Sequence, residues 1–175
     1  MRSVLSILFT MTLALWLTVS PASEAIAALP GIGHAFAGSR PENIGVKDGT
    51  LASCPASPNC VVSQGGDEEH AIAPIVYQGD RAAARKNLIS ILGVAPRTKI
   101  VDERDSYVLT ESESRLMGFV DDTEFYLPAD ENVIHVRAAA RLGESDLGVN
   151  RRRVEQIRLA MRDLESRGGA PNSAE

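Results

Sequence analysis

The sequence predicts an α+β fold, in which one antiparallel sheet has the element order β-α-β-β-β-β-α and both helices pack on one face. Three observations predict it. Segments of strand type and of helix type follow one another in that order. The last strand segment alternates between an apolar set and a largely charged set of residues. Each helix segment carries its apolar residues along one side, which a sheet would cover.

The first strand is expected over residues 71–77, where Pro74 indicates a sheet edge or a bulge. Asp80 then supplies the N-cap of a helix over residues 81–92, and Gly93 is expected to end it. The apolar side of this helix comprises Ala84, Leu88, Ile91 and Leu92. Their spacing predicts an amphipathic helix.

Four strands are expected after this helix. They span residues 98–103, 107–113, 119–127 and 133–141. The third contains an expected irregularity at Asp121 and Asp122. The apolar face of the last strand comprises Ile134, Val136, Ala138 and Ala140. The other, largely charged face comprises His135, Arg137, Ala139 and Arg141. Since an antiparallel sheet can leave one face in water, we expect the charged face to be exposed and to carry the function.

The second helix is expected to begin at Asn150 as its cap, to run to Arg167 and to end at Gly168 and Gly169. Its apolar stripe comprises Val154, Ile157, Met161 and Leu164. The small alanines on the inner face of the preceding strand let this helix pack closely over the sheet. Residues 169–175 are expected to form a disordered tail.

The N-terminus has the layout of a signal peptide over residues 1–27. Arg2 precedes an uncharged apolar stretch at residues 4–19, and Ala25 and Ala27 supply small residues around the cleavage point. An uncleaved membrane anchor is the alternative, although the stretch is shorter than the about 20 residues that a spanning helix needs. We therefore expect a periplasmic or otherwise exported protein, with no stable membrane insertion once the signal is cleaved.

The remaining chain divides into two parts. Residues 28–66 are rich in Gly, Pro, Ser and Asn and lack periodic apolar residues, so we expect an irregular N-terminal arm. Residues 67–168 are expected to form a single α+β domain. The net charge of -5 and the 5% aromatic content argue against a nucleic-acid partner. No cofactor is expected.

The only two cysteines, Cys54 and Cys60, enclose a short loop that two prolines stiffen. In an exported chain, a disulfide between them is the leading hypothesis. Metal binding together with His34 or His70 is the alternative, but the spacing fits no standard zinc pattern. A redox-active pair would need the Cys-x-x-Cys spacing, which is absent here.

A second group of candidates lies at residues 114–124, where Arg115 is close in sequence to Asp121, Asp122 and Glu124. Adjacent residues of a regular strand point to opposite faces, so Asp121 and Asp122 are not automatically a catalytic pair. The plain interpretation is a turn or bulge with a salt bridge. General acid–base catalysis is the alternative, and it would need one buried carboxyl group with a raised pKa.

The last two long strands predict their own pairing. Matching their apolar faces across a turn at residues 129–132 pairs Phe125 with Val136. The same register sets Glu124 opposite Arg137 on the outer face, so that Arg137 has a partner.

A possible anion site follows this strand. Arg141 is close to the loop that carries Ser145 and Asp146 and leads into the last helix at Asn150. Arg141, Ser145 and the backbone amides near Asn150 are candidates for holding a carboxylate or phosphate. The alternative is that Asp146 folds back onto Arg141 or caps the helix. A catalytic role for Ser145 lacks the Gly-x-Ser-x-Gly elbow.

Three motifs together resemble one protein family. They are Cys-Pro-x-Ser-Pro-Asn-Cys-Val at 54–61, Ser-Arg-Leu-Met-Gly-Phe-Val-Asp-Asp-x-Glu at 114–124, and Arg-x-Ala-x-Arg-x-Gly-x-Ser-Asp-Leu-Gly-Val-Asn-Arg-x-Arg at 137–153. In this order they resemble the bacterial and plastid family catalogued as domain of unknown function 1499. The resemblance covers residues 51–164 and departs from the family pattern at Glu144, where an aromatic residue is more usual, and at Val62, where serine is.

The resemblance implies an exported or membrane-associated setting and no established reaction. It marks as motif positions Cys54, Cys60, Arg115, Gly118, Asp121, Asp122, Arg137, Arg141, Asp146, Gly148 and Asn150.

From these observations we expect a non-catalytic periplasmic binding or interaction module for a small anion or a protein partner. It would use the polar sheet face and the loop before the last helix. The candidate ligand-binding residues are Arg115, Asp121, Asp122, Arg137, Arg141, Ser145, Asp146 and Asn150. A hydrolase- or isomerase-like enzyme is one alternative and requires the carboxylates and arginines to converge in a cleft. A carrier of a small apolar ligand is another and requires a cavity beneath the helices.

Overall fold

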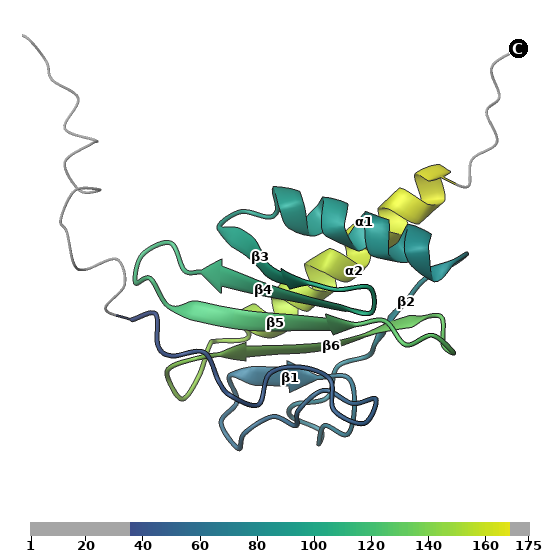
Figure 1. Ribbon diagram of the computed structural model, residues 1–175. Coiled ribbons are helices and arrows are strands. Elements are labelled where there is room, and N and C mark those ends of the chain that lie inside the picture. Colours follow the sequence, from purple (N-terminus) through teal and green to yellow (C-terminus); the bar gives the residue numbers. More distant parts are fainter. Residues whose placement is uncertain (1–35, 169–175) are drawn as a thin grey trace, which may run out of the picture. The chain divides into compact units, whose positions relative to one another are not determined.

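The computed structural model describes residues 36–168 and confirms the predicted class of fold. Six strands form a sheet in the order β1-β6-β5-β4-β3, with β2 pairing to β6 off this path. All these pairs are antiparallel, and both helices lie on one face of the sheet (Figure 1). The elements are β1 (Cys60–Val62), β2 (Ile75–Val76), α1 (Arg81–Val94), β3 (Thr98–Glu103), β4 (Tyr107–Glu113), β5 (Val120–Tyr126), β6 (Val133–Ala140) and α2 (Val149–Gly168).

The strand predicted over residues 71–77 is shorter than expected. Only Ile75 and Val76 pair with β6, while Ala71 makes an isolated bridge to Val62. Pro74 precedes the paired residues and has no N–H to offer a neighbouring strand. The segment therefore lies at the margin of the sheet, as Pro74 predicts.

Helix α1 confirms its predicted start and extends beyond its predicted end. The side chain of Asp80 accepts a hydrogen bond from the Ala83 amide at 2.8 Å, as an N-cap does. Gly93 does not end the helix, which continues to Val94. Ala95 is extended because it precedes Pro96, and a residue before proline is disfavoured in the helical region.

The register between β5 and β6 is the predicted one. Phe125 pairs with Val136, and Glu124 pairs with Arg137. The irregularity expected at residues 121–122 is absent, because β5 pairs in regular register along its whole length. The register shift instead lies in β3, between Ile100 and Asp102.

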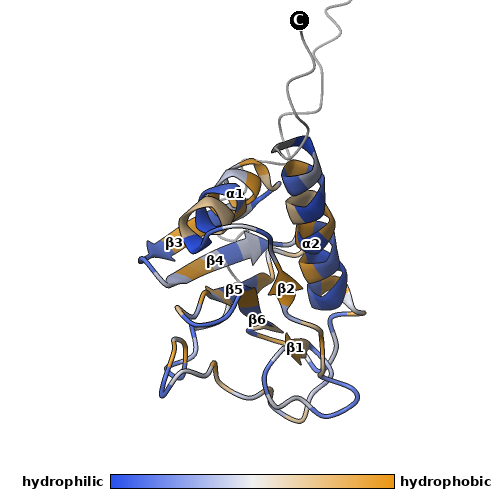
Figure 2. Ribbon diagram, turned by 90° about the vertical axis from the view of Figure 1, so that its right-hand side faces the viewer, coloured by the Kyte–Doolittle hydropathy of each residue, from blue (hydrophilic) through white to orange (hydrophobic). Residues whose placement is uncertain are grey.

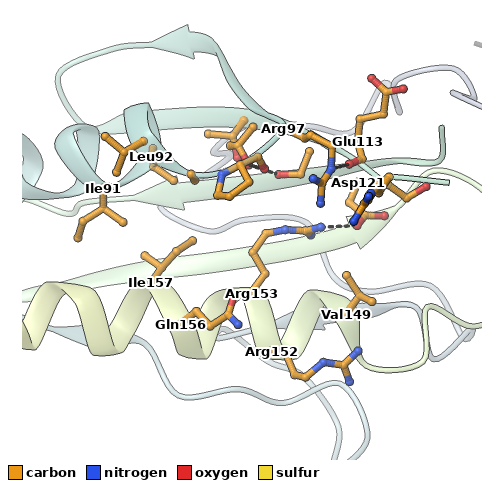
Figure 3. Close-up of a pocket in the computed structure, with 18 residues that line it drawn as sticks. Ile91, Leu92, Arg97, Glu113, Asp121, Val149, Arg152, Arg153, Gln156 and Ile157 are labelled. Carbon is orange, nitrogen blue, oxygen red and sulfur yellow. Dashed lines mark hydrogen bonds and ion pairs between the residues drawn. The ribbon is translucent and has the colours of Figure 1, made fainter. Parts of the chain in front are cut away.

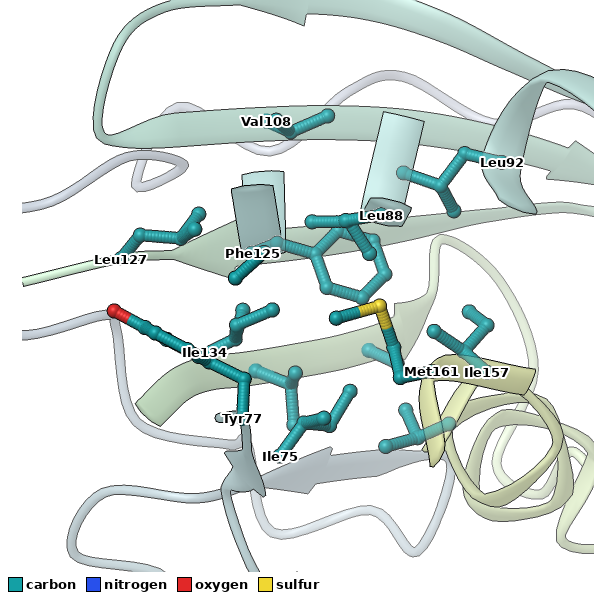
Figure 4. Packing of buried hydrophobic residues seen from close by; sticks show 14 of the residues in the cluster. Ile75, Tyr77, Leu88, Leu92, Val108, Phe125, Leu127, Ile134, Ile157 and Met161 are labelled. Carbon is teal, nitrogen blue, oxygen red and sulfur yellow. The ribbon is translucent and has the colours of Figure 1, made fainter. Parts of the chain in front are cut away.

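The main core lies between the two helices and the sheet. Phe125 of β5 lies between Leu88 of α1 and Met161 of α2 (Figure 4). Val136 of β6 belongs to the same cluster, and all four side chains are fully buried. In Figure 2 hydrophobic and hydrophilic residues follow one another along both helices, as expected of helices with one buried side. The space beneath the helices is thus filled by side chains.

The N-terminal arm covers much of the other face of the sheet, which corrects the expectation of a solvated charged face. A second cluster packs Leu51 of the N-terminal arm against Tyr107 and Leu109, with Ile44 and Val46 beside them. Tyr107 and Leu109 alternate with inward-facing residues of β4, so the outer face of this strand offers apolar surface for the arm.

The arm is therefore part of the folded unit, contrary to the predicted domain boundary at residue 67. Strand β1 lies within the segment expected to be irregular and pairs with β6. Residues 36–168 belong to one compact unit. Because β1 has only three residues, its periodicity was too short to predict a strand.

Several sequence predictions fall outside the described residues, namely the signal peptide at 1–27, the role of His34 and the tail at 169–175. Among residues 36–168, no helix has the length and apolarity to cross a bilayer.

Candidate functional site

A cleft of about 620 Å³ lies where the end of α1, the ends of the central strands and the first turns of α2 meet (Figure 3). We call it the arginine cleft because Arg97, Arg115, Arg152 and Arg153 all line it. Its apolar lining comprises Ile91, Leu92, Val94, Val149 and Ile157. Its hydroxyl lining comprises Thr98, Thr110, Ser112 and Ser114.

The strand register explains why these residues converge. Thr98 at the start of β3 pairs with Ser112 near the end of β4, and Glu113 pairs with Val120 at the start of β5. The loop before β3 therefore lies beside the β4–β5 turn, which brings Arg97 near Arg115. The first turns of α2 add Arg153, which points toward Asp121, and Arg152, whose guanidinium turns toward the β6–α2 loop (Figure 3).

Three of the four arginines lack a carboxylate partner within the described part of the chain. Arg97 donates through Nε to the Glu113 carbonyl at 3.1 Å, and Arg152 donates through Nη1 to the Leu147 carbonyl at 2.8 Å. Arg115 is exposed in the β4–β5 turn. Their remaining N–H groups are free to bind an anion, which arginine does with two parallel hydrogen bonds.

Asp121 is the carboxylate at the base of the cleft. Arg153 Nη2 donates to its Oδ2 at 2.7 Å. Burial raises the pKa of Asp121, and this effect outweighs the positive charge and hydrogen bond of Arg153, which lower it. The cleft thus contains one paired arginine and three arginines open to a ligand.

The structure does not bring together the residues of the anion site predicted around Arg141 and the amides near Asn150. Arg141 turns to the opposite face of the sheet and donates to both oxygens of Asp122 at 2.7 Å. Asp146 accepts from the Asn150 amide at 2.7 Å and from the Gly148 amide at 2.9 Å. Asp146 therefore caps α2, which begins at Val149 rather than after an Asn150 cap.

Asn150 and Ser145 also have structural contacts. The buried side chain of Asn150 donates through Nδ2 to the Asn59 carbonyl at 3.2 Å, and its Oδ1 accepts from Arg153 Nη1 at 2.6 Å. Ser145 accepts from the Leu147 amide at 3.2 Å within the loop. Asn150 fixes the start of α2 against the arm and orients Arg153 toward Asp121.

The charged residues of the outer face form a buried network under the arm. Arg137 Nη1 donates to Glu124 at 3.2 Å, and the Tyr107 hydroxyl donates to Glu124 at 3.0 Å. Burial raises the pKa of Tyr107 well above its ordinary value, and the nearby Glu124 charge raises it further. The hydrogen bonds among Glu124, Arg137 and Tyr107 therefore stabilise the fold, and the arm covers these side chains.

A separate chain of ion pairs joins the arm to the sheet. Arg141 contacts both Asp122 and Glu111, and Glu111 also contacts Arg40 of the arm. Burial alone would raise the pKa of Glu111, but the hydrogen bonds from Arg40 and Arg141 outweigh it and lower the pKa. Hydrogen bonding to Asp122 raises the pKa of Arg141, so its charge is fixed.

The carboxylates named by the enzyme hypothesis do not converge. Asp121 faces the arginine cleft, whereas Asp122 and Glu124 bind arginines on the opposite side of the sheet. This division follows the alternation of a regular strand for Asp121 and Asp122. Of the predicted ligand-binding residues, the cleft lining includes Arg115 and Asp121.

Sequence reasoning missed Arg97, Arg152 and Arg153 as site residues. The run of three arginines at residues 151–153 was a visible signal, but only the helix geometry shows which of them face the sheet. Arg97 gave a weaker signal, because its position beside Glu113 depends on the β3–β4 register.

The predicted disulfide is present between Cys54 and Cys60, with a Cα–Cα distance of 5.6 Å. Within residues 36–168, no group of three or more potential metal ligands is found.

A comparison with protein families matches residues 50–161 to a family described as a protein of unknown function, DUF1499. This match covers the arm from its disulfide loop onward, the whole sheet and most of α2. No curated protein and no solved structure matches the chain.

Proposed function

Since the chain belongs to the DUF1499 family of proteins of unknown function, we propose its role from the geometry of the site: an exported, non-catalytic binding module. Its arginine cleft would hold a small amphipathic anion, a carboxylate or phosphate joined to a short apolar group. This proposal moves the predicted anion site from the outer sheet face to the opposite side of the sheet.

One observation carries the proposal. Arg97, Arg115 and Arg152 line a single cleft without carboxylate partners in the described chain, although most other arginines of the domain have one. Unpaired guanidinium groups around a concave surface favour an anionic ligand. The apolar lining beside them favours a ligand that also has a hydrocarbon part.

The two alternative functions receive less support. An acid–base enzyme would need a second catalytic group beside Asp121, and the two other carboxylates of its cluster lie across the sheet. An apolar-ligand carrier would need space beneath the helices, where Leu88, Phe125 and Met161 are packed together.

Export is supported by the disulfide and by the apolar N-terminal stretch at residues 4–19. Structural disulfides form and persist in oxidising compartments. N-terminal sequencing of the protein recovered from a periplasmic fraction tests this part of the proposal. A new N-terminus near residue 28 is expected, and full-length protein in the cytosol would contradict export.

Calorimetric titration with octyl phosphate, below its micelle concentration, tests the cleft. We expect one site per chain, with weaker binding of inorganic phosphate and of octyl glucoside, which each lack one half of the recognised chemistry. Arg115→Gln combined with Arg152→Gln should weaken octyl phosphate binding at least about tenfold, since two charge-assisted hydrogen bonds are lost.

Arg162→Gln is the control for the α2 half of this variant, because it removes one positive charge from α2 about 15 Å farther along the helix axis than Arg152. This variant should bind octyl phosphate like the wild type. Equal weakening by both sets of substitutions would refute the cleft as the binding site, as would equal affinity for octyl phosphate and octyl glucoside.

A further inference from the structure

Three loops meet at one end of the sheet, and we call this region the loop end. They are the α1–β3 connection at residues 95–97, the β4–β5 turn at 114–119 and the β6–α2 loop at 141–148 (Figure 1). The register requires this grouping, because Val120 pairs with Glu113 and Asp121 pairs with Ala140. The loop end is thus also the end where the arginine cleft lies.

Most large hydrophobic residues that are exposed in the described chain gather at or beside the loop end. They are Phe36, Val94, Leu116, Met117, Leu142, Leu147 and Val149, against Val76 and Leu159 elsewhere. Leu116 is 90% exposed and Leu147 is 83% exposed, so neither contributes to the core. Exposed apolar residues gathered in one region indicate a surface that another molecule or a membrane covers.

Basic residues lie among these apolar side chains. The exposed Arg97, Arg115 and Arg152 lie there with the exposed Glu113 and Glu144. The balance is positive by one charge, although the whole chain carries a net charge of -5. Apolar residues interleaved with arginines match the interface of an anionic bilayer, where hydrocarbon and phosphate groups lie within a few ångströms of each other.

The path of the chain points to the same partner. The described part begins at Phe36, whose ring lies 5.3 Å from that of Phe119 in the β4–β5 turn. Residues 20–35 separate this point from the apolar stretch at residues 4–19. Sixteen extended residues reach at most about 55 Å. Before the signal is cleaved, an apolar stretch that engages a membrane therefore holds the loop end of the domain within about 55 Å of that membrane.

We propose that the loop end docks on the surface of an anionic phospholipid bilayer. Leu116, Met117 and Leu147 enter the layer between headgroups and acyl chains, and the exposed arginines contact lipid phosphates. Docking of this kind needs no spanning helix. It goes beyond the binding of a free amphiphile, and it also places the arginine cleft where an anionic amphiphile can pass from the bilayer into it.

Tryptophan fluorescence tests the proposal on the processed chain, which begins near residue 28. Trp16 is the only tryptophan of the sequence, so the processed chain is a silent background. In that background, Leu116→Trp should shift its emission to the blue on addition of vesicles with phosphatidylglycerol and phosphatidylcholine, and brominated lipids should quench it. Met117→Trp serves as a second reporter in the same turn.

The matched control is Leu159→Trp, at an exposed position of α2 away from the loop end. Its emission should stay unchanged with the same vesicles. Because the processed chain lacks residues 4–19, a shift at residue 116 or 117 cannot result from membrane binding through them. Unchanged emission at both residues 116 and 117, or an equal shift at residue 159, would overturn the docking surface.

Two further outcomes distinguish membrane docking from self-association and from failure of the proposed ligand site. A blue shift that appears without vesicles and depends on protein concentration would identify a second copy of the chain as the partner and would also overturn the proposal. Octyl phosphate titration of the Leu116→Trp variant reports on the cleft separately, so failure of membrane docking and failure of the proposed ligand site are distinguishable.

Discussion

Glu124 on β5 and Arg137 on β6 lie directly opposite each other, and both side chains are buried between the sheet and the N-terminal arm. The Gly45 amide of the arm donates to the same carboxylate at 2.7 Å. Glu124 therefore accepts hydrogen bonds from the arm and from both neighbouring strands. This carboxylate links the arm to the sheet.

Glu124→Gln is expected to lower the free energy of unfolding by about 3 kcal/mol, because it leaves the charge of Arg137 buried without compensation. The side-chain amide oxygen of the variant can still accept a hydrogen bond from the Gly45 N–H, so the loss of stability reports on the buried charge. Urea denaturation measures it. Combining Glu124→Gln with Arg137→Met should cost less than the sum of the two single substitutions, since the buried charge is then gone.

Asp163→Asn is the control for this substitution, because it breaks the exposed Asp163–Arg167 pair on α2. It should change the free energy of unfolding by less than about 0.5 kcal/mol. A Glu124→Gln variant as stable as Asp163→Asn would show that the ion pair does not hold the arm.

The register that pairs Glu124 with Arg137 could be predicted from the sequence, but the burial of this pair could not. The register follows from two long strands whose apolar faces can be matched only one way across a short turn. Burial depends on the arm, which has no periodicity because it crosses the sheet as irregular chain and buries single residues such as Leu51. Tyr107 and Leu109, alternating outward on β4, were the available signal that something covers this face.

The site was predictable only in part for a related reason. Arg115 and Asp121 lie within one continuous motif, whereas Arg97 and Arg152 come from the ends of other elements. Their meeting depends on how α2 crosses the sheet, and no local pattern encodes that crossing. For Asp146 the sequence left a helix cap open as the alternative to ligand binding, and Asp146 does cap α2, while Asn150 anchors this helix to the arm.

Removal of the disulfide by Cys54→Ala together with Cys60→Ala should lower the free energy of unfolding by about 2 kcal/mol, the chain-entropy value for so short a loop. Cys60 also begins β1, which joins the arm to β6. Denaturant midpoints of the wild type and the double variant measure the loss. Dithiothreitol should lower the wild-type midpoint to a similar value and leave the variant unchanged; a wild-type midpoint insensitive to reduction would contradict the prediction.

Asp121→Asn is expected to strengthen octyl phosphate binding by about three- to tenfold, corresponding to about 1 kcal/mol for a partly buried pair. The substitution frees Arg153 and removes a negative charge from the cleft. Because burial raises the pKa of Asp121, the site tolerates a neutral side chain and the fold should persist. Asp163→Asn makes the same change of charge far from the cleft, and an equal gain with it would attribute the effect to net charge alone.

His70 and Asp67 should give the arm a pH dependence near neutrality. His70 Nδ1 lies 2.7 Å from Asp67 Oδ1, and Nε2 lies 3.2 Å from the Ser57 carbonyl, so the protonated ring can donate to both. The hydrogen bond to Asp67 raises the pKa of His70 above 6.5, against burial, which lowers it. Its stabilising contribution is thus complete below about pH 6.5 and is lost as the pH rises through the pKa of the folded protein.

Nuclear magnetic resonance titration of the His70 ring measures this shift. Asp67→Asn should lower the pKa of His70, because the amide keeps the backbone hydrogen bond but loses the negative charge. Glu68→Gln, at an exposed neighbouring residue, is the control. The pKa of His70 should be higher in this variant than in Asp67→Asn. The free energy of unfolding of the wild type should fall more steeply above pH 6.5 than that of Asp67→Asn, and parallel curves would show that the pair does not couple protonation to folding.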